Sequence, residues 1–145
     1  MIPKAVLAGM IPHAGTMCLL DGVIQWDASS IRCVASSHRD PQNPLAIDGT
    51  LGAVCGAEYA AQAMAVHGGL AGVVGERPKS GYLMSLRALG LHRERLDDLA
   101  GDLVIDAERL TGEGFQIVYR FAVACEEKLI LDGRAAVLLA DRPPS

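Results

Sequence analysis

The stretch at residues 48–74, DGTLGAVCGAEYAAQAMAVHGGLAGVV, decides how the rest of the chain is interpreted. Almost all of it is small and apolar, and Glu58 is its single charged side chain after Asp48. A segment that is apolar on every side is typical of a helix buried in a protein core or in a membrane. We expect a helix over about residues 50–67, with Asp48 or Thr50 capping its first turn.

The length of this stretch also suits a membrane span, which needs about 20 apolar residues. Three features argue against a span: Ala and Gly outnumber Leu and Ile, Glu58 and Gln62 fall in the middle, and Gly68 with Gly69 follows. We therefore expect a buried helix in a soluble protein, ended by the two glycines in a left-handed conformation.

Glu58 is the candidate for chemistry in this helix. An ionised carboxyl group is costly to bury, so it pairs with a cation or takes up a proton. A carboxyl group held in its protonated form suits general acid catalysis near neutral pH. The alternative is that Glu58 faces solvent or pairs with an arginine; we favour the catalytic interpretation.

Length and composition limit the remaining possibilities. The 145 residues predict one domain spanning 1–145. A net charge of −4 and 4% aromatic residues argue against nucleic-acid binding. The four cysteines have no C-x-x-C spacing, so neither a metal site nor disulfides are expected. Without a secretory signal at the N-terminus, we expect a cytoplasmic protein.

Charge is unevenly distributed along the chain. Residues 76–95 hold five basic and two acidic side chains, a local charge of +3 in a chain of −4. Such a region suits an acidic partner or a phosphate-bearing ligand; the alternative is a merely solvated stretch. The basic residues are Arg77, Lys79, Arg87, Arg93 and Arg95.

The order of elements predicts the fold. Around the long helix we expect a short helix at 2–9 and strands at 18–26, 31–36, 82–91, 102–108, 115–125 and 129–140. Short turns between consecutive strands imply an antiparallel sheet. A sheet of five to seven antiparallel strands wrapped around one long central helix is an α+β architecture, the hotdog fold.

Two histidines precede the long helix. His13 follows Pro12, which restricts the backbone, and His38 begins a loop rich in turn-forming residues that leads to the helix. A single histidine is more often structural than catalytic, so local evidence assigns neither of them a role.

In this order the motifs resemble those of 3-hydroxyacyl-(acyl carrier protein) dehydratases, and most closely their divergent aryl-polyene-type branch. The matching segments are IPH at 11–13, MCLLDGV at 17–23, NP at 43–44, DG at 48–49, EYAAQ at 58–62 and GDLV at 101–104. The chain departs from the family's H-F-P-x-x-P loop, where it reads His38-Arg39-Asp40-Pro41-Gln42-Asn43-Pro44.

The resemblance implies elimination of water from a 3-hydroxyacyl thioester. One histidine would remove the C2 proton while Glu58 protonates the departing hydroxyl group. His13 is our first choice for the base and His38 the alternative, because the segment between residue 44 and Glu58 is longer than usual. We expect the reaction to need no cofactor and no metal.

Other residues would bind the substrate. Backbone N–H groups at the helix start, at Gly49, Thr50 and Leu51, would stabilise charge on the thioester carbonyl. Gln62 would orient Glu58 or the hydroxyl group.

The resemblance also implies a dimer, either of identical chains or with another hotdog subunit. An acyl carrier protein or its phosphopantetheine arm would bind the basic region. Two alternatives remain: a hotdog acyl thioesterase, in which the helix carboxylate activates water, and a non-catalytic acyl-binding partner subunit.

Overall fold

The computed structural model describes residues 1–7, 18–71, 80–113 and 116–140. Its elements in chain order are β1 (Ile2–Pro3), α1 (Lys4–Leu7), β2 (Gly22–Trp26), β3 (Ser30–Ala35), the 3-10 turns η3 (Ser37–Arg39) and η4 (Ala53–Cys55), α2 (Gly56–Leu70), β4 (Ser80–Leu91), β5 (Leu103–Glu113), β6 (Gln116–Cys125) and β7 (Lys128–Ala140). No helix in the described ranges has the length and apolar character needed to cross a membrane.

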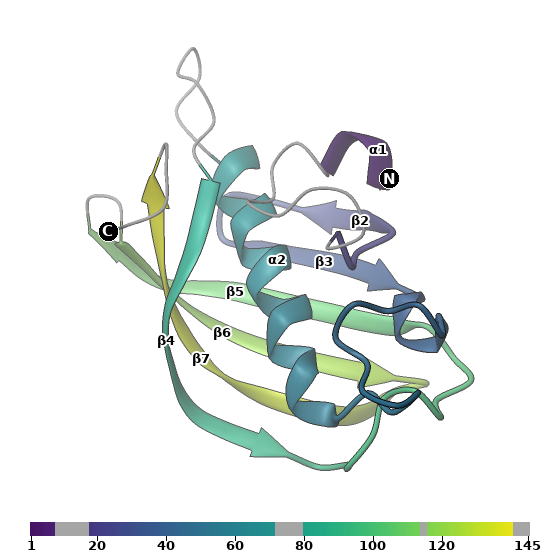
Figure 1. The fold of residues 1–145 in the computed structure, drawn as a ribbon. Helices are drawn as coiled ribbons and strands as arrows, with labels where there is room; N and C mark the ends of the chain where they lie inside the picture. Colours follow the sequence, from purple (N-terminus) through teal and green to yellow (C-terminus); the bar gives the residue numbers. More distant parts are fainter. Residues whose placement is uncertain (8–17, 72–79, 114–115, 141–145) are drawn as a thin grey trace.

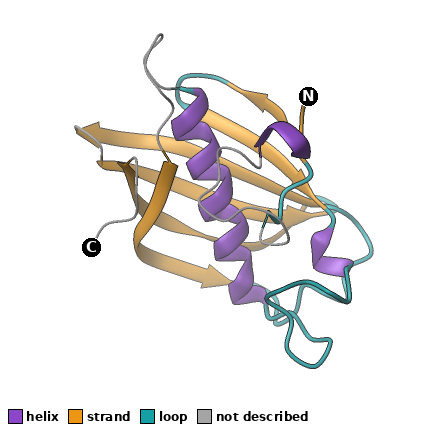
Figure 2. Ribbon diagram, turned by 45° about the horizontal axis from the view of Figure 1, so that its top comes forward, coloured by secondary structure: helices purple, strands orange, loops and turns teal. Residues whose placement is uncertain are grey.

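The seven strands form one antiparallel sheet in the order β1-β2-β3-β5-β6-β7-β4. The sheet curves around α2, which lies along its concave face (Figures 1 and 2). This arrangement confirms the predicted antiparallel sheet around one long helix.

Alternation along the strands builds the core. In β6 every second side chain from Ile117 to Cys125 is buried, as the sequence pattern predicts. In β3, Ile31, Cys33 and Ala35 are buried in the same way. These side chains face α2, where small residues such as Ala60 and Ala63 are fully buried.

The start of α2 differs from the prediction. Asp48 and Gly49 both have positive φ (51° and 76°) and form a two-residue hairpin turn, in which the N–H groups of Ile47 and Thr50 donate to each other's carbonyls at 2.9 Å. Asp-Gly favours this turn because both positions need a left-handed backbone. The helix itself begins at Gly56 after the 3-10 turn η4, and no side chain caps it.

The end of α2 also differs. Gly68 and Gly69 lie inside the helix, which ends at Leu70, and neither has a positive φ. The prediction of a left-handed glycine cap is therefore wrong. At the N-terminus, Ile2–Pro3 is a strand and the short helix begins at Lys4; its predicted end at residue 9 lies outside the described residues.

β4 is one of the two edge strands of the sheet, and its large apolar residues from Leu83 to Leu91 are exposed. No described strand pairs with its outer edge (Figure 1). Register shifts between Leu83 and Ser85 and between Arg87 and Gly90 interrupt the strict alternation we predicted for this strand. β-Bulges of this kind move the following side chains to the other face.

Candidate active site

Glu58 lies in the first turn of α2 and is half-buried, so it is less enclosed than the sequence predicts. Its neighbours Ala57 and Tyr59 are buried. Burial and the nearby charge of Glu58 raise the pKa of the Cys55 thiol, which lies one turn earlier. None of the ion pairs among the described residues involves Glu58. No arginine among the described residues therefore holds the carboxyl group.

Gln62, one helical turn after Glu58, is buried and holds the chain that precedes β2. Its Oε1 accepts a hydrogen bond from the backbone N–H of Leu19 at 2.8 Å. Residues four apart share one face of a helix, so Glu58 and the anchoring of Leu19 lie on the same side of α2.

The carbonyl of Leu19 is held as well, by Ser37. The Ser37 hydroxyl donates to this carbonyl at 2.8 Å and lies 2.8 Å from the Tyr59 hydroxyl. Because the one hydroxyl proton of Ser37 is used on Leu19, Tyr59 must donate to Ser37 Oγ. Tyr59 is fully buried and accepts in turn from Asn43 Nδ2 at 3.1 Å.

Asn43 completes this network. Its Nδ2 also donates to the Ser37 carbonyl at 2.8 Å, and its Oδ1 accepts from the Leu45 N–H at 2.8 Å. Tyr59 and its two partners thus fix η3, the loop that follows it and the chain before β2 relative to the first turns of α2. Tyr59 and Asn43 occur in the motifs of the sequence, but their residue types alone assign no role to them.

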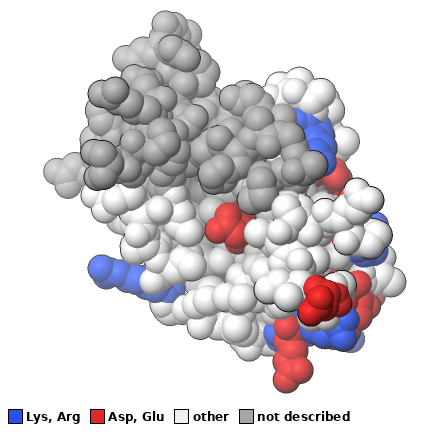
Figure 3. All heavy atoms as spheres, viewed as in Figure 1, with Lys and Arg blue, Asp and Glu red and all other residues white. Residues whose placement is uncertain are grey.

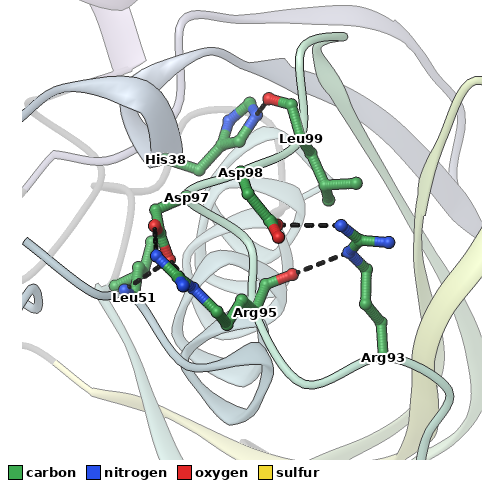
Figure 4. A network of polar contacts seen from close by, with 7 residues as sticks. All are labelled: His38, Leu51, Arg93, Arg95, Asp97, Asp98 and Leu99. Atoms are coloured by element: carbon green, nitrogen blue, oxygen red, sulfur yellow. Dashed lines mark hydrogen bonds and ion pairs between the residues drawn. The ribbon is translucent and has the colours of Figure 1, made fainter.

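His38 is buried beside the loop that leads into β5 (Figure 4). Its Nε2 lies 3.1 Å from the Leu99 carbonyl, which can only accept, so this nitrogen carries the proton. Nδ1 is buried and has no hydrogen-bond partner among the described residues. Burial lowers the pKa of His38 despite the hydrogen bond to Leu99. The neutral ring is thus tied to the backbone through one nitrogen.

Three other predicted site residues, His13, Arg77 and Lys79, lie outside the described residues. The structure therefore brings together Glu58 and Gln62 on α2 and places His38 on η3.

Gly49, Thr50 and Leu51 do not lie at the helix start, as we predicted. Thr50 donates its N–H to Ile47 within the hairpin turn, and Leu51 donates its N–H to Asp97 Oδ1 at 2.8 Å. The amides of Thr50 and Leu51 are therefore occupied by the protein itself. The hairpin turn and η4 both lie in the segment between residue 44 and Glu58.

Two of the five residues of the predicted basic region pair with aspartates. Arg93 pairs with Asp98 at 2.9 Å, and Arg95 pairs with Asp97 (Figure 4). The guanidinium of Arg95, followed by the Leu51 N–H, holds the pKa of Asp97 well below its usual range. In Figure 3, acidic and basic side chains are mixed at this end of the molecule. The sequence window of 76–95 ended just before the two aspartates that pair with Arg93 and Arg95.

Arg87, from the same predicted region, and two further arginines form no ion pair with a described acidic group, and no local sequence pattern predicts that the three lie together. Arg120 on β6 lies opposite Arg134 on β7, which in turn lies opposite Arg87 on β4. All three are exposed. Only the strand register brings together residues so far apart in sequence. We call Arg87, Arg120 and Arg134 the arginine row.

An open hollow of about 550 Å³ lies beside η4, at the end of α2 that carries Glu58. The exposed side chains of Val54 and Leu91 contribute to its lining. Within the described ranges, no three side chains of the types that bind metal ions lie together.

Comparisons with known proteins agree with this architecture. A family model described as ApeP-like, ApeP dehydratase, matches residues 6–143. Among curated proteins, no significant match was found.

Solved structures share the fold. The dehydratase heterocomplex ApeI:P from Xenorhabdus doucetiae contains a chain with a TM-score of 0.84 and 22% identity, covering 98% of this chain and 93% of that one. A thioesterase from Haemophilus influenzae has a TM-score of 0.67 and 14% identity, covering 96% and 91%. Zebra fish thioesterase superfamily member 2 has a TM-score of 0.63 and 16% identity, covering 94% and 95%.

Proposed function

The chain belongs to the ApeP-like dehydratase family, and from this premise we propose that it removes water from a 3-hydroxyacyl thioester with Glu58 as the general acid. The observation that carries the proposal is the position of Glu58: a half-buried carboxyl group without an ion-pair partner among the described residues, in the first turn of the central helix.

The reaction needs two proton transfers. A neutral imidazole takes the proton from C2, the C2–C3 double bond forms as the C3–O bond breaks, and protonated Glu58 donates to the departing oxygen, which leaves as water. The products are the 2-enoyl thioester and water. The imidazolium and the carboxylate return to their starting states by proton exchange with solvent.

We propose His13 as the base. His38 is the weaker candidate, because its Nε2 proton is bound to the Leu99 carbonyl and its bare Nδ1 is buried. His13 lies six residues before Leu19 in the sequence, and Leu19 is held at both its N–H and its carbonyl by the polar network beside Glu58. The chain that follows His13 is thus anchored beside Glu58, which supports His13 as the base.

We propose that the acyl chain lies in the hollow beside η4, against Val54 and Leu91. Val54 is four residues before Glu58, so the hollow opens at the same end of the helix. Gln62 would contribute indirectly, by fixing the chain before β2.

Two observations support a partner subunit: the similar heterocomplex and the free edge of the sheet at β4. The similar chain in the Xenorhabdus doucetiae structure is part of a dehydratase heterocomplex. We propose that this protein also works with a second hotdog subunit, which adds a strand to the free edge of β4. Exposed apolar side chains along β4, such as Met84 and Leu91, support this surface. The thioester would be carried by an acyl carrier protein, with Arg77 and Lys79 as its proposed contacts.

One assay tests the proposal. A conjugated 2-enoyl thioester is incubated with the protein, and loss of the enone absorbance is measured beside release of free thiol. Loss of absorbance without thiol is expected. Thiol release would instead indicate a thioesterase, and neither signal would indicate an acyl-binding subunit.

Separate His13→Ala and His38→Ala variants identify the base: His13→Ala is expected to abolish hydration, and the reverse result would assign His38.

A further inference from the structure

The arginine row crosses three neighbouring strands on the face of the sheet that points away from α2. Phe121 and Ala135, the chain neighbours of Arg120 and Arg134, are buried against the helix, so the two arginines point to the opposite face. Arg87 is the register partner of Arg134 and shares that face. The sheet therefore separates the row from Glu58, and the row is no part of the acid site.

Half of the eight described arginines form no ion pair with a described acidic group, namely the three of the row and Arg109 on β5. The other four each form an ion pair with an aspartate at a distance of 3.1 Å or less: Arg32, Arg39, Arg93 and Arg95. No described acidic group pairs with a member of the row. Like charges directly opposite each other across strands are destabilising.

Two acidic side chains lie near the row without forming an ion pair with it. Glu108 is the register partner of Arg120 at the end of the row farthest from β4. Asp132, two residues before Arg134, is bound to His92 at 3.2 Å. Neither pairs with Arg87, whose positive charge at the edge of the sheet thus has no ion-pair partner among the described residues.

The row ends at the strand edge where another subunit would join. Residues 80–91, SGYLMSLRALGL, contain one charged residue, Arg87, and no Asp or Glu. Exposed leucines and a methionine on this strand favour association, but they favour a second copy of the chain as much as any other partner. The charge distinguishes the two cases.

Building on the proposed function, which places the partner subunit at β4, we propose that the arginine row selects against a second copy of this chain and for a different subunit with an acidic side chain opposite or diagonal to Arg87. Two copies joined edge to edge through β4 would bring two rows together on one continuous face, with no acid from either edge strand between them. An acidic residue on the partner strand would instead complete the row, since opposite charges across strands are stabilising.

Sedimentation of the chain alone tests this inference. The wild type is expected to be mainly monomeric at low salt. Arg87→Gln removes the charge at the edge, so its dimer Kd is expected to fall by about tenfold or more, equivalent to about 1.4 kcal/mol. Arg32→Gln is the matched control, because it removes the same charge from the same face, far from β4, and leaves the wild-type Kd unchanged.

Two further experiments show whether the effect on dimerisation depends on charge. Raising the salt to about 0.5 M should strengthen wild-type dimers toward those of Arg87→Gln, because screening shortens the range of repulsion. An equimolar mixture of wild type and Arg87→Glu should associate more tightly than either alone, since the acid then faces the row.

A tight, salt-independent wild-type homodimer would overturn the inference, and so would an Arg87→Gln variant that dimerises no better than Arg32→Gln. Circular dichroism confirms that each variant is folded. The measurement uses no enzymatic activity, so its failure and a failure of the proposed dehydration are read separately.

Discussion

Tyr59 is the residue on which the geometry around Glu58 depends most. It is fully buried, donates to Ser37 and accepts from Asn43, and so joins α2 to η3 and the following loop. A buried polar group that loses its partner costs about 1–3 kcal/mol. We therefore expect Tyr59→Phe to lower the free energy of unfolding by about that amount in urea denaturation.

A double-mutant cycle separates this contact from simple loss of packing. Ser37→Ala combined with Tyr59→Phe should cost less than the two single changes together, because each removes the same hydrogen bond. Strict additivity would show that the two hydroxyl groups act independently, contrary to the network described above.

At the scale of elements, the turn before α2 is set by its backbone conformation. Gly49 has φ of 76°, and an added Cβ would meet nothing within 4 Å, so only backbone strain opposes a side chain there. Gly49→Ala should destabilise the protein by about 1 kcal/mol. Gly52→Ala is the matched control, because Gly52 has φ of −66° and an added Cβ there would meet only Val54 Cγ1, at 4.0 Å. Equal melting temperatures for the two variants would contradict this account.

The sequence predicted which segments form helix and strands better than where they begin. Small apolar residues identified α2, yet Asp48-Gly49 reads equally as a helix cap and as a hairpin turn, and only the pairing of Ile47 with Thr50 decides between them. The pairing of Arg95 with Asp97 and the assembly of the arginine row depend on loop geometry and strand register. Local sequence patterns specify neither loop geometry nor strand register. Short connections between consecutive strands, by contrast, do predict antiparallel pairing.

At the scale of the whole molecule, a buried histidine ties the far end of α2 to the sheet. His67 Nε2 donates to the Asp27 carbonyl at 2.8 Å, so Nδ1 accepts from the Tyr119 hydroxyl at 2.6 Å. Burial lowers the pKa of His67 and raises that of Tyr119 to about 12. His38 is also buried with a lowered pKa. Both rings are therefore neutral in the folded state.

These two histidines predict how stability depends on pH. In the unfolded chain these histidines bind protons below about pH 6.5, whereas in the folded chain their lowered pKa values keep them neutral there. The free energy of unfolding should therefore fall as the pH decreases from about 6.5 toward the folded pKa values. Each histidine contributes a slope of at most about 1.4 kcal/mol per pH unit. Urea titrations between about pH 7.5 and pH 5.5, about one unit either side of this threshold, measure it. His67→Gln should reduce the slope, and His92→Gln, an exposed control, should leave it in place; a slope unaffected by His67→Gln would refute the assignment.

The central claim is that Glu58 supplies the proton to the departing hydroxyl group. The most direct measurement is enoyl-thioester hydration by Glu58→Gln beside Glu127→Gln, a control at an exposed residue of the β6–β7 turn. Loss of a general acid lowers the rate by about 10²–10⁴-fold. We predict that loss for Glu58→Gln and wild-type rates for Glu127→Gln, with both variants folded. Hydration at the wild-type rate by Glu58→Gln would contradict the account.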